Sequence, residues 1–289
     1  MDSDPSSYFN SSMFFKASVL TLSFTAIYFY RTERQLSFIE MPLAKRDSLI
    51  KVPVVKNVVK KKRKTIYLTF DDGPDKGTKT VMDILKEEQI PATLFIIGQH
   101  VYGSRLQQQI YDSIKGCNYF EIANHSYTHA FRNMFNTFYS EPDSAVHDFE
   151  RCEDSMHFTS NIIRTPGRNI WRTQNITSTD MKASEATADS LYSKGFTAVG
   201  WDVEWHYDND QKLIQTDSEM VNIIDSAFAH NKTKTYGHLV LLAHDRTFKT
   251  CDDSVRLRKF ITALKQKDEY DFEVVSRYPG LSKDTITVK

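Results

Sequence analysis

The stretch TIYLTFDDGP, residues 65–74, decides the fold, because a short apolar run ends there in two adjacent aspartates and a Gly-Pro turn. The run TIYLTF predicts a buried strand. A solvated turn needs at most one acidic cap, and like charges in contact repel, so the pair Asp71 and Asp72 needs an explanation. One interpretation is an ordinary turn. The other is that one carboxylate holds a metal ion while its neighbour handles a proton.

The composition excludes several classes of protein. The chain has 289 residues, and Lys+Arg and Asp+Glu are equal at 37 each, so no global charge favours nucleic acid as a partner. Cys117, Cys152 and Cys251 stand far apart without CxxC spacing, which argues against a disulfide framework or a zinc–thiolate cluster. A single disulfide with one thiol left over stays open. The length suits one large α/β domain or two small ones.

Residues 1–34 differ from the rest of the chain. Their uncharged stretch ASVLTLSFTAIYFY, residues 17–30, predicts a signal anchor or transmembrane helix, although a span needs about 20 residues. A cleaved signal peptide and a buried core helix are the alternatives, and no A-x-A-like cleavage site is evident. The basic residues after this stretch outnumber the one before it, Lys16, which would favour a cytoplasmic domain downstream.

Residues 35–64 predict a linker that ends in the basic run KNVVKKKRK, residues 56–64. This run is either a solvated tether or a segment that contacts anionic lipid or cell-wall polymer, and a nuclear-localisation signal is open by composition. A catalytic domain is expected over 65–280, followed by a short tail, 281–289.

From Thr65 onward, short apolar runs alternate with helical patterns. The strand candidates are 65–70, 92–97, 119–123, 161–164, 196–201, 238–243 and 271–275. Apolar residues at i, i+3, i+4 and i+7 mark helix faces at Leu257, Phe260, Ile261 and Leu264, and at Met220, Ile224 and Ala227. Strands that alternate with helices predict a parallel sheet, here a closed or nearly closed barrel.

The chemically capable side chains follow the predicted strands. They are Asp71, Asp72, His125, His129, Arg164, Glu204, Trp205 and His244. The carboxyl ends of strands in a parallel barrel share one rim, where active sites are built. This placement favours the metal interpretation of the two aspartates.

The segment NHSYTH, residues 124–129, places His125 and His129 four residues apart. On a helical turn that spacing points both imidazoles the same way, although such a pair is often a coincidence of surface histidines. With one aspartate they make three protein ligands and leave positions open for water and substrate, as in catalytic zinc sites. The other aspartate is then free to take a proton from the water that the ion activates.

These segments resemble the polysaccharide deacetylases, the NodB-type family also called carbohydrate esterase family four. The resemblance covers roughly residues 65–280 and rests on TFDDGP, HSYTH, RTP at 164–166, EW at 204–205 and LLAH at 241–244. It implies an irregular (β/α)7 barrel, here behind an N-terminal anchor segment. It also implies metal-dependent removal of an N-acetyl or O-acetyl group from a polysaccharide, with Zn²⁺ or another divalent ion such as Co²⁺ as cofactor.

The resemblance also assigns roles residue by residue. Asp71 matches the catalytic base, and the metal ligands are matched by Asp72, His125 and His129. Arg164 matches the arginine that holds the base, and His244 matches the general acid.

The remaining matches are looser. Glu204 takes the place of an aspartate that orients the acid histidine, and Asp202 is the alternative. Gly167 offers an N–H to the oxyanion, whereas Trp205 and Leu242 match the walls of the acetyl-methyl pocket. The family usually has an aromatic residue and then glycine after the motif proline; here Gly167 and Arg168 follow, which changes the expected sugar contacts.

We therefore expect a zinc-dependent deacetylase of N-acetylglucosamine-containing glycan, of the peptidoglycan or chitooligosaccharide type. The alternatives are a small-molecule amidohydrolase of the same superfamily and a catalytically dead glycan-binding domain. The expected partners are the acetylated polysaccharide and, through the N-terminal segment, a membrane. Neither nucleic acid nor an obligate protein partner is expected. The catalytic domain is expected outside the cytoplasmic membrane, either anchored or secreted.

Overall fold

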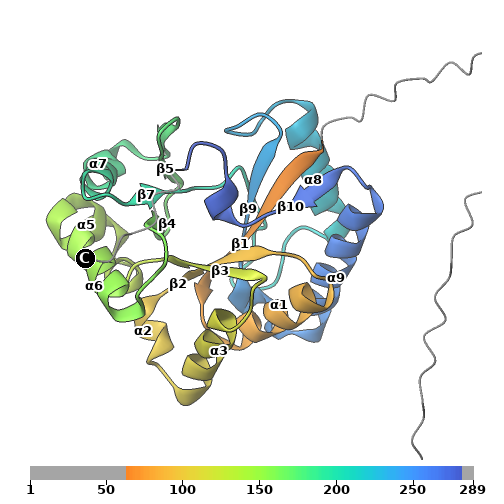
Figure 1. Ribbon diagram of the computed structural model, residues 1–289, viewed down its shortest axis with the longest axis horizontal. Coiled ribbons are helices and arrows are strands. Elements are labelled where there is room, and N and C mark those ends of the chain that lie inside the picture. Colours follow the sequence, from red (N-terminus) through yellow and green to blue (C-terminus); the bar gives the residue numbers. More distant parts are fainter. Residues whose placement is uncertain (1–62, 282–289) are drawn as a thin grey trace, which may run out of the picture. The chain divides into compact units, whose positions relative to one another are not determined.

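The computed structural model describes residues 63–281, in which short strands alternate with helices (Figure 1). The strands are β1 (Lys64–Gly73), β2 (Ala92–Ile96), β3 (Phe120–Asn124), β4 (Ile162–Ile163), β5 (Ile170–Arg172), β6 (Thr177–Thr179), β7 (Thr197–Ala198), β8 (Val203–Glu204), β9 (His238–His244) and β10 (Tyr270–Phe272). The helices are α1 (Lys76–Glu87), α2 (Gly98–Val101), α3 (Arg105–Lys115), α4 (His129–Asn133), α5 (Phe135–Ser140), α6 (Pro142–Met156), α7 (Glu185–Ser193), α8 (Asp217–Ala229) and α9 (Cys251–Gln266). The predicted α/β class is confirmed.

Seven strands run parallel in the order β8-β9-β1-β2-β3-β4-β7. β5 and β6 extend the β7 edge as antiparallel strands, and β10 lies parallel to the first residues of β1. Within residues 63–281 no strand pairing joins β8 to the opposite end, so the sheet is open where a closed or nearly closed barrel was predicted. The seven parallel strands also differ from the predicted set, because β8 was missed and residues 271–275 contribute only to β10.

Strand β1 separates apolar and polar side chains onto its two faces. Ile66, Leu68 and Phe70 pack in one core cluster, whereas Tyr67 lies in another. Because successive residues of a strand point to opposite faces, Asp71 at the end of β1 shares the face of Tyr67. The alternation in the sequence therefore directs the aspartate to the face opposite Ile66, Leu68 and Phe70.

The predicted helix faces are buried against the other side of β1. In α9 and α8 all of the expected apolar residues belong to the cluster that contains Ile66 and Leu68. Figure 1 shows α1, α3, α8 and α9 outside the central strands. These helices fix the sheet on one side and leave the carboxyl ends of the strands free for a site.

The predicted N-terminal segments lie mostly outside the described residues. This applies to the anchor stretch 17–30, to the linker except its last two residues, and to the tail after residue 281. Across residues 63–281 no helix combines the length and the apolar character that a membrane crossing requires. Cys117, Cys152 and Cys251 are all free thiols, so the disulfide left open by the sequence does not form.

Candidate active site

A β-bulge at the end of β1 brings both aspartates to one cavity. Asp71 pairs with Phe95 and Gly73 with Ile96, which makes Asp72 the extra residue, and its φ is 78°. Neighbouring residues of a regular strand face opposite ways, but a bulge re-aims the side chain that it adds. The two carboxylates are therefore buried, at 2% and 5% exposure, and line the same cavity.

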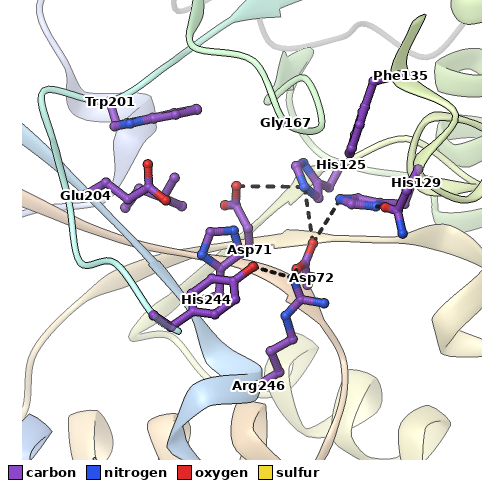
Figure 2. Close-up of a pocket in the computed structure, with 13 residues that line it drawn as sticks. Asp71, Asp72, His125, His129, Phe135, Gly167, Trp201, Glu204, His244 and Arg246 are labelled. Carbon is purple, nitrogen blue, oxygen red and sulfur yellow. Dashed lines mark hydrogen bonds and ion pairs between the residues drawn. The ribbon is translucent and has the colours of Figure 1, made fainter. Parts of the chain in front are cut away.

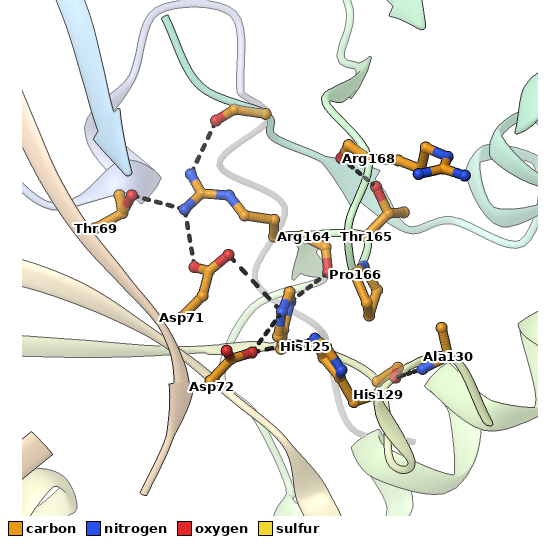
Figure 3. Close-up of polar contacts among 12 residues, drawn as sticks. Thr69, Asp71, Asp72, His125, His129, Ala130, Arg164, Thr165, Pro166 and Arg168 are labelled. Atoms are coloured by element: carbon orange, nitrogen blue, oxygen red, sulfur yellow. Dashed lines mark hydrogen bonds and ion pairs between the residues drawn. The ribbon is translucent and has the colours of Figure 1, made fainter. Parts of the chain in front are cut away.

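Arg164 holds the first aspartate in place from the end of β4 (Figure 3). Its Nη1 donates to Asp71 Oδ1 at 3.0 Å and to Thr69 Oγ1 at 2.6 Å. Its Nε and Nη2 donate to the carbonyls of Val199 and Gly200 at 3.1 and 2.8 Å. Burial lowers the pKa of this guanidinium, and the charge of Asp71 opposes that effect. A fully buried cation with so many bonds cannot turn away, so the expected arginine contact is present and rigid.

The two histidines present the same ring nitrogen to Asp72. His125 Nδ1 lies 2.9 Å from the carbonyl oxygen of Arg164, and His129 Nδ1 lies 2.5 Å from Asn133 Oδ1. Both partners are acceptors, so each Nδ1 carries a proton and Nε2 is the ring nitrogen left to face Asp72. The Nε2 atoms lie 3.5 and 3.1 Å from Asp72 Oδ1. Histidines that bind a metal ion are held in the same way, with one ring N–H bonded to the protein and the other ring nitrogen directed at the ion.

The helical turn predicted for these histidines is wrong. Ser126 has a φ of 63°, and the residues of α4, which begins at His129, have left-handed φ values between 52° and 71°. Thr128 caps the segment through the N–H of Phe131. The spacing of four therefore works through a loop and a left-handed turn, a backbone shape that no helical periodicity describes.

The residues fit a divalent metal ion. Ligand atoms of Asp72, His125 and His129 all lie within 4.8 Å of one another. Burial alone would raise the pKa of Asp72, but the neighbouring imidazoles hold that pKa well below its usual range, so the carboxylate is ionised. One carboxylate and two imidazoles, without a thiolate, suit Zn²⁺ and similar ions and leave coordination positions open.

His244 lies across the cavity from the two metal-facing histidines (Figure 2). It ends β9 and pairs in register with Asp71. Burial lowers the pKa of its imidazole, against the charges of the nearby Asp72 and Asp71 carboxylates. Its Nδ1 has no hydrogen-bond partner among residues 63–281, and the ring of Tyr207 meets it edge-on with centroids 4.9 Å apart.

The alternative role for Asp202 is wrong. Its two carboxylate oxygens accept hydrogen bonds from the N–H groups of Lys234 and Val240 at 2.7 and 2.8 Å, which fastens β9 to the loop before β8. Glu204 lines the cavity, and its nearest ion-pair contact is His206 at 3.5 Å. No hydrogen bond joins Glu204 to His244 in the described chain, so its proposed orienting role stays a prediction.

The expected tryptophan wall is formed by a different tryptophan. Trp205 is 1% exposed, donates to the carbonyl of Gln215 and packs against Phe248 and Phe260 in the core. The cavity, of about 480 Å³, is instead lined by Trp201 together with Leu242 and Gly167. Trp205 follows β8, which has only two residues, so the sequence could not predict which of the nearby side chains faces the cavity.

The loop after β4 requires glycine at position 167. Gly167 has a φ of 65°, and a Cβ there would lie 2.8 Å from a ring carbon of Phe135. The guanidinium of Arg168 lies over the rings of Phe135 and Tyr139, with its central carbon 5.7 and 5.4 Å from the ring centres. Gly167 and Arg168, which stand where the resemblance leads one to expect an aromatic residue and then glycine, are thus accommodated by a left-handed glycine at the cavity wall.

Five cavity residues were missed by reasoning from the sequence. They are Asn133, Phe135, Trp201, Tyr207 and Arg246. For Arg246 a signal was available, because it comes two residues after His244 at the end of a strand. The others lie on loops or at the ends of the short helices α4 and α5, where no periodicity marks the inward side.

Taken together, these side chains define a buried site that can hold one divalent ion next to a carboxylate and a histidine suited to proton transfer. Residues 58–173 match the family described as "Polysaccharide deacetylase". A chitooligosaccharide deacetylase of Bradyrhizobium sp. (strain ANU 289) is 30% identical over 152 residues, which are 49% of this chain and 57% of the relative. The peptidoglycan-N-acetylglucosamine deacetylase of Bacillus cereus is 38% identical over 77 residues, 26% of each protein.

Solved structures share the fold. The catalytic domain of peptidoglycan N-acetylglucosamine deacetylase from Eubacterium rectale has a TM-score of 0.55 at 22% identity, covering 78% of this chain and 94% of that one. A family 4 carbohydrate esterase from Streptomyces lividans has a TM-score of 0.53 at 19% identity, covering 76% and 97%. Residues 58–173 are therefore similar in sequence to polysaccharide deacetylases, and residues 63–281 share the fold of these solved structures. It spans less than two thirds of the length of the curated relatives that it matches.

Proposed function

We propose that this protein is a metal-dependent deacetylase that hydrolyses the N-acetyl groups of N-acetylglucosamine units in a glycan of the peptidoglycan or chitooligosaccharide type. The convergence of Asp72 Oδ1 with two imidazole Nε2 atoms, beside the arginine-held Asp71, carries the proposal. The names of the two curated relatives supply the class of substrate. An open cavity at the rim of the sheet suits a polymer better than an enclosed small molecule.

Asp72, His125 and His129 would hold the ion. When bound, the ion would polarise the acetyl carbonyl and lower the pKa of a water molecule. Asp71 takes one proton as that water's oxygen adds to the carbonyl carbon, and Arg164 keeps the carboxylate oriented.

The leaving group departs on the other side of the cavity. His244 gives a proton to the sugar nitrogen as the carbon–nitrogen bond breaks, which yields acetate and a free amine. Gly167 lines the cavity, and its N–H is the candidate oxyanion donor. Leu242 and Trp201 exclude water around the acetyl methyl group.

We place the catalytic domain outside the cytoplasmic membrane, where acetylated wall polymers are found. The uncharged stretch 17–30 and the proposed substrate support this placement, whereas the basic residues that follow the stretch favour the opposite orientation. A reporter fused after residue 40 should be active outside the cytoplasm. Activity in the cytoplasm alone would refute the placement without affecting the chemistry.

The test of the chemistry is acetate release from N-acetylated chitooligosaccharides, peptidoglycan and acetyl-xylan. We expect release from one or both of the first two, abolished by chelation and restored by Zn²⁺ or Co²⁺. Full activity with the metal content confirmed near zero contradicts the metal dependence. Release from acetyl-xylan alone contradicts the proposed substrate, and release from none of the three contradicts the proposal as a whole.

A further inference from the structure

Arg246 contacts the metal-facing carboxylate from the side opposite the histidines. Its Nη2 lies 2.8 Å from Asp72 Oδ2 as an ion pair, and its side chain is 33% exposed against 4% for Asp72 (Figure 2). It follows β9 in the short helix Asp245–Lys249, so the same strand that delivers His244 also delivers this cation.

The two oxygens of Asp72 therefore have different neighbours. Oδ1 faces the Nε2 atoms of His125 and His129, at 3.5 and 3.1 Å, whereas Oδ2 faces the guanidinium. A carboxylate can bind a metal ion through one oxygen or through both. Groups that hold the outer oxygen decide between these modes and orient the ligand.

Tyr207 holds Arg246 in that position. The Arg246 Nη2 donates to the Tyr207 hydroxyl at 2.7 Å, and the guanidinium lies 5.3 Å from the centre of the Tyr207 ring. The same ring meets His244 edge-on. One aromatic side chain thus touches both the acid histidine and the arginine that pairs with the metal-facing carboxylate.

We propose that Arg246 is a positioning residue of the metal site, which occupies Asp72 Oδ2 so that the carboxylate binds the ion through Oδ1 alone, and that Tyr207 fixes Arg246 for this task. The inference rests on the proposed function only in that the site binds a divalent ion. It assigns no contact with the substrate to Arg246.

Metal affinity alone does not test this proposal. Removing Arg246 takes away a positive charge, which strengthens the attraction of the site for a cation, but it also releases the ligand, which weakens binding. In contrast, removal of Arg246 can change the number of Asp72 oxygens bound to the ion in one direction only. Arginine removal allows Asp72 to bind through both oxygens, so the coordination number rises.

The experiment is visible absorption of the Co²⁺-loaded protein, because the d–d bands of Co²⁺ lose intensity as the coordination number rises. We expect Arg246→Met to lose band intensity relative to wild type, and Arg246→Lys, which still places a cation near Oδ2, to retain it. Arg168→Met is the matched control, since it removes a nearby arginine that touches no metal ligand. Its spectrum should stay at the wild-type intensity.

Each outcome decides a separate point. An unchanged spectrum for Arg246→Met, in a protein whose circular dichroism shows it to be folded, overturns the positioning role. If Arg246→Met does not fold, the same comparison on Arg246→Gln decides it. If wild type takes up no Co²⁺, the metal site itself is refuted, and with it the proposed function.

Discussion

The two adjacent aspartates should fail in different ways when each is changed to asparagine. Asp71 Oδ1 is held by Arg164 at 3.0 Å, whereas Asp72 Oδ1 belongs to the metal-facing group. Asparagine keeps the size of the side chain but cannot take a proton as a carboxylate does. Asp71→Asn should therefore keep the metal and lose turnover, and Asp72→Asn should lose the metal.

The magnitudes follow from these contacts. General-base catalysis is typically worth about 10²–10⁴-fold, so Asp71→Asn should cut turnover by that factor. Its stability should fall by about 3 kcal/mol, the lower end for breaking a buried ion pair, because the amide oxygen still accepts from Arg164. Loss of a group that merely supports a ligand costs about 10–100-fold in metal affinity. Loss of the Asp72 ligand charge should cost at least about 100-fold.

The assay pairs metal content after dialysis, measured by mass spectrometry, with acetate release in limiting and in excess zinc. Excess zinc should recover part of the activity of Asp72→Asn and none of that of Asp71→Asn. Asp75→Asn is the control, because Asp75 caps α1 outside the cavity and asparagine caps equally well. Loss of metal from Asp71→Asn with retention by Asp72→Asn would reverse the two roles. Full activity in both variants would refute the site.

Three further predictions follow from the walls and supports of the site. Trp205→Ala should destabilise the fold by about 3–5 kcal/mol, measured as a lower melting temperature. Trp201→Ala should lower kcat/KM by at least about tenfold with little change in melting temperature. An equal loss of melting temperature in both variants would contradict this division between a core and a cavity tryptophan. Gly167→Ala should cost about 1–2 kcal/mol in urea unfolding because of its positive φ and the contact with Phe135, and a neutral result would refute the strain. Burial raises the pKa of Asp202 from 3.8 to about 6 in the folded protein. The folded state therefore binds this proton more tightly than the unfolded state, and the free energy of unfolding should fall by up to about 3 kcal/mol as the pH rises from 3.8 to about 6. Urea unfolding of Asp202→Asn should lack this pH dependence.

The sequence predicted the parts of the fold that depend on periodicity. The apolar run 65–70 predicted the buried strand that ends at Asp71, and the apolar spacing in 257–264 marked the buried side of α9. Both patterns extend over several residues, so one irregular position does not erase them. The α/β class and the strand-end location of the site followed from such patterns.

Other features could not be predicted because they depend on single backbone positions. The bulge at Asp72 and the left-handed turn at His129 change the direction of a side chain without changing any pattern of apolar residues. Strand β8 has only two residues, too few for a period, and its register decides that Trp201 rather than Trp205 reaches the cavity. Tertiary pairing with β9 fixes that register, and no local signal encodes it.

Two adjacent carboxylates repel each other, and in this site each of them is paired with its own arginine. Arg164 reaches Asp71 from the end of β4, and Arg246 reaches Asp72 from the end of β9. The two cations come from strands on either side of β1, and the bulge brings both carboxylates to the one cavity that they reach. Each carboxylate thus has its own cationic partner within the buried cavity. Because these arginines come from strands distant in sequence, the site can form only after the sheet has assembled.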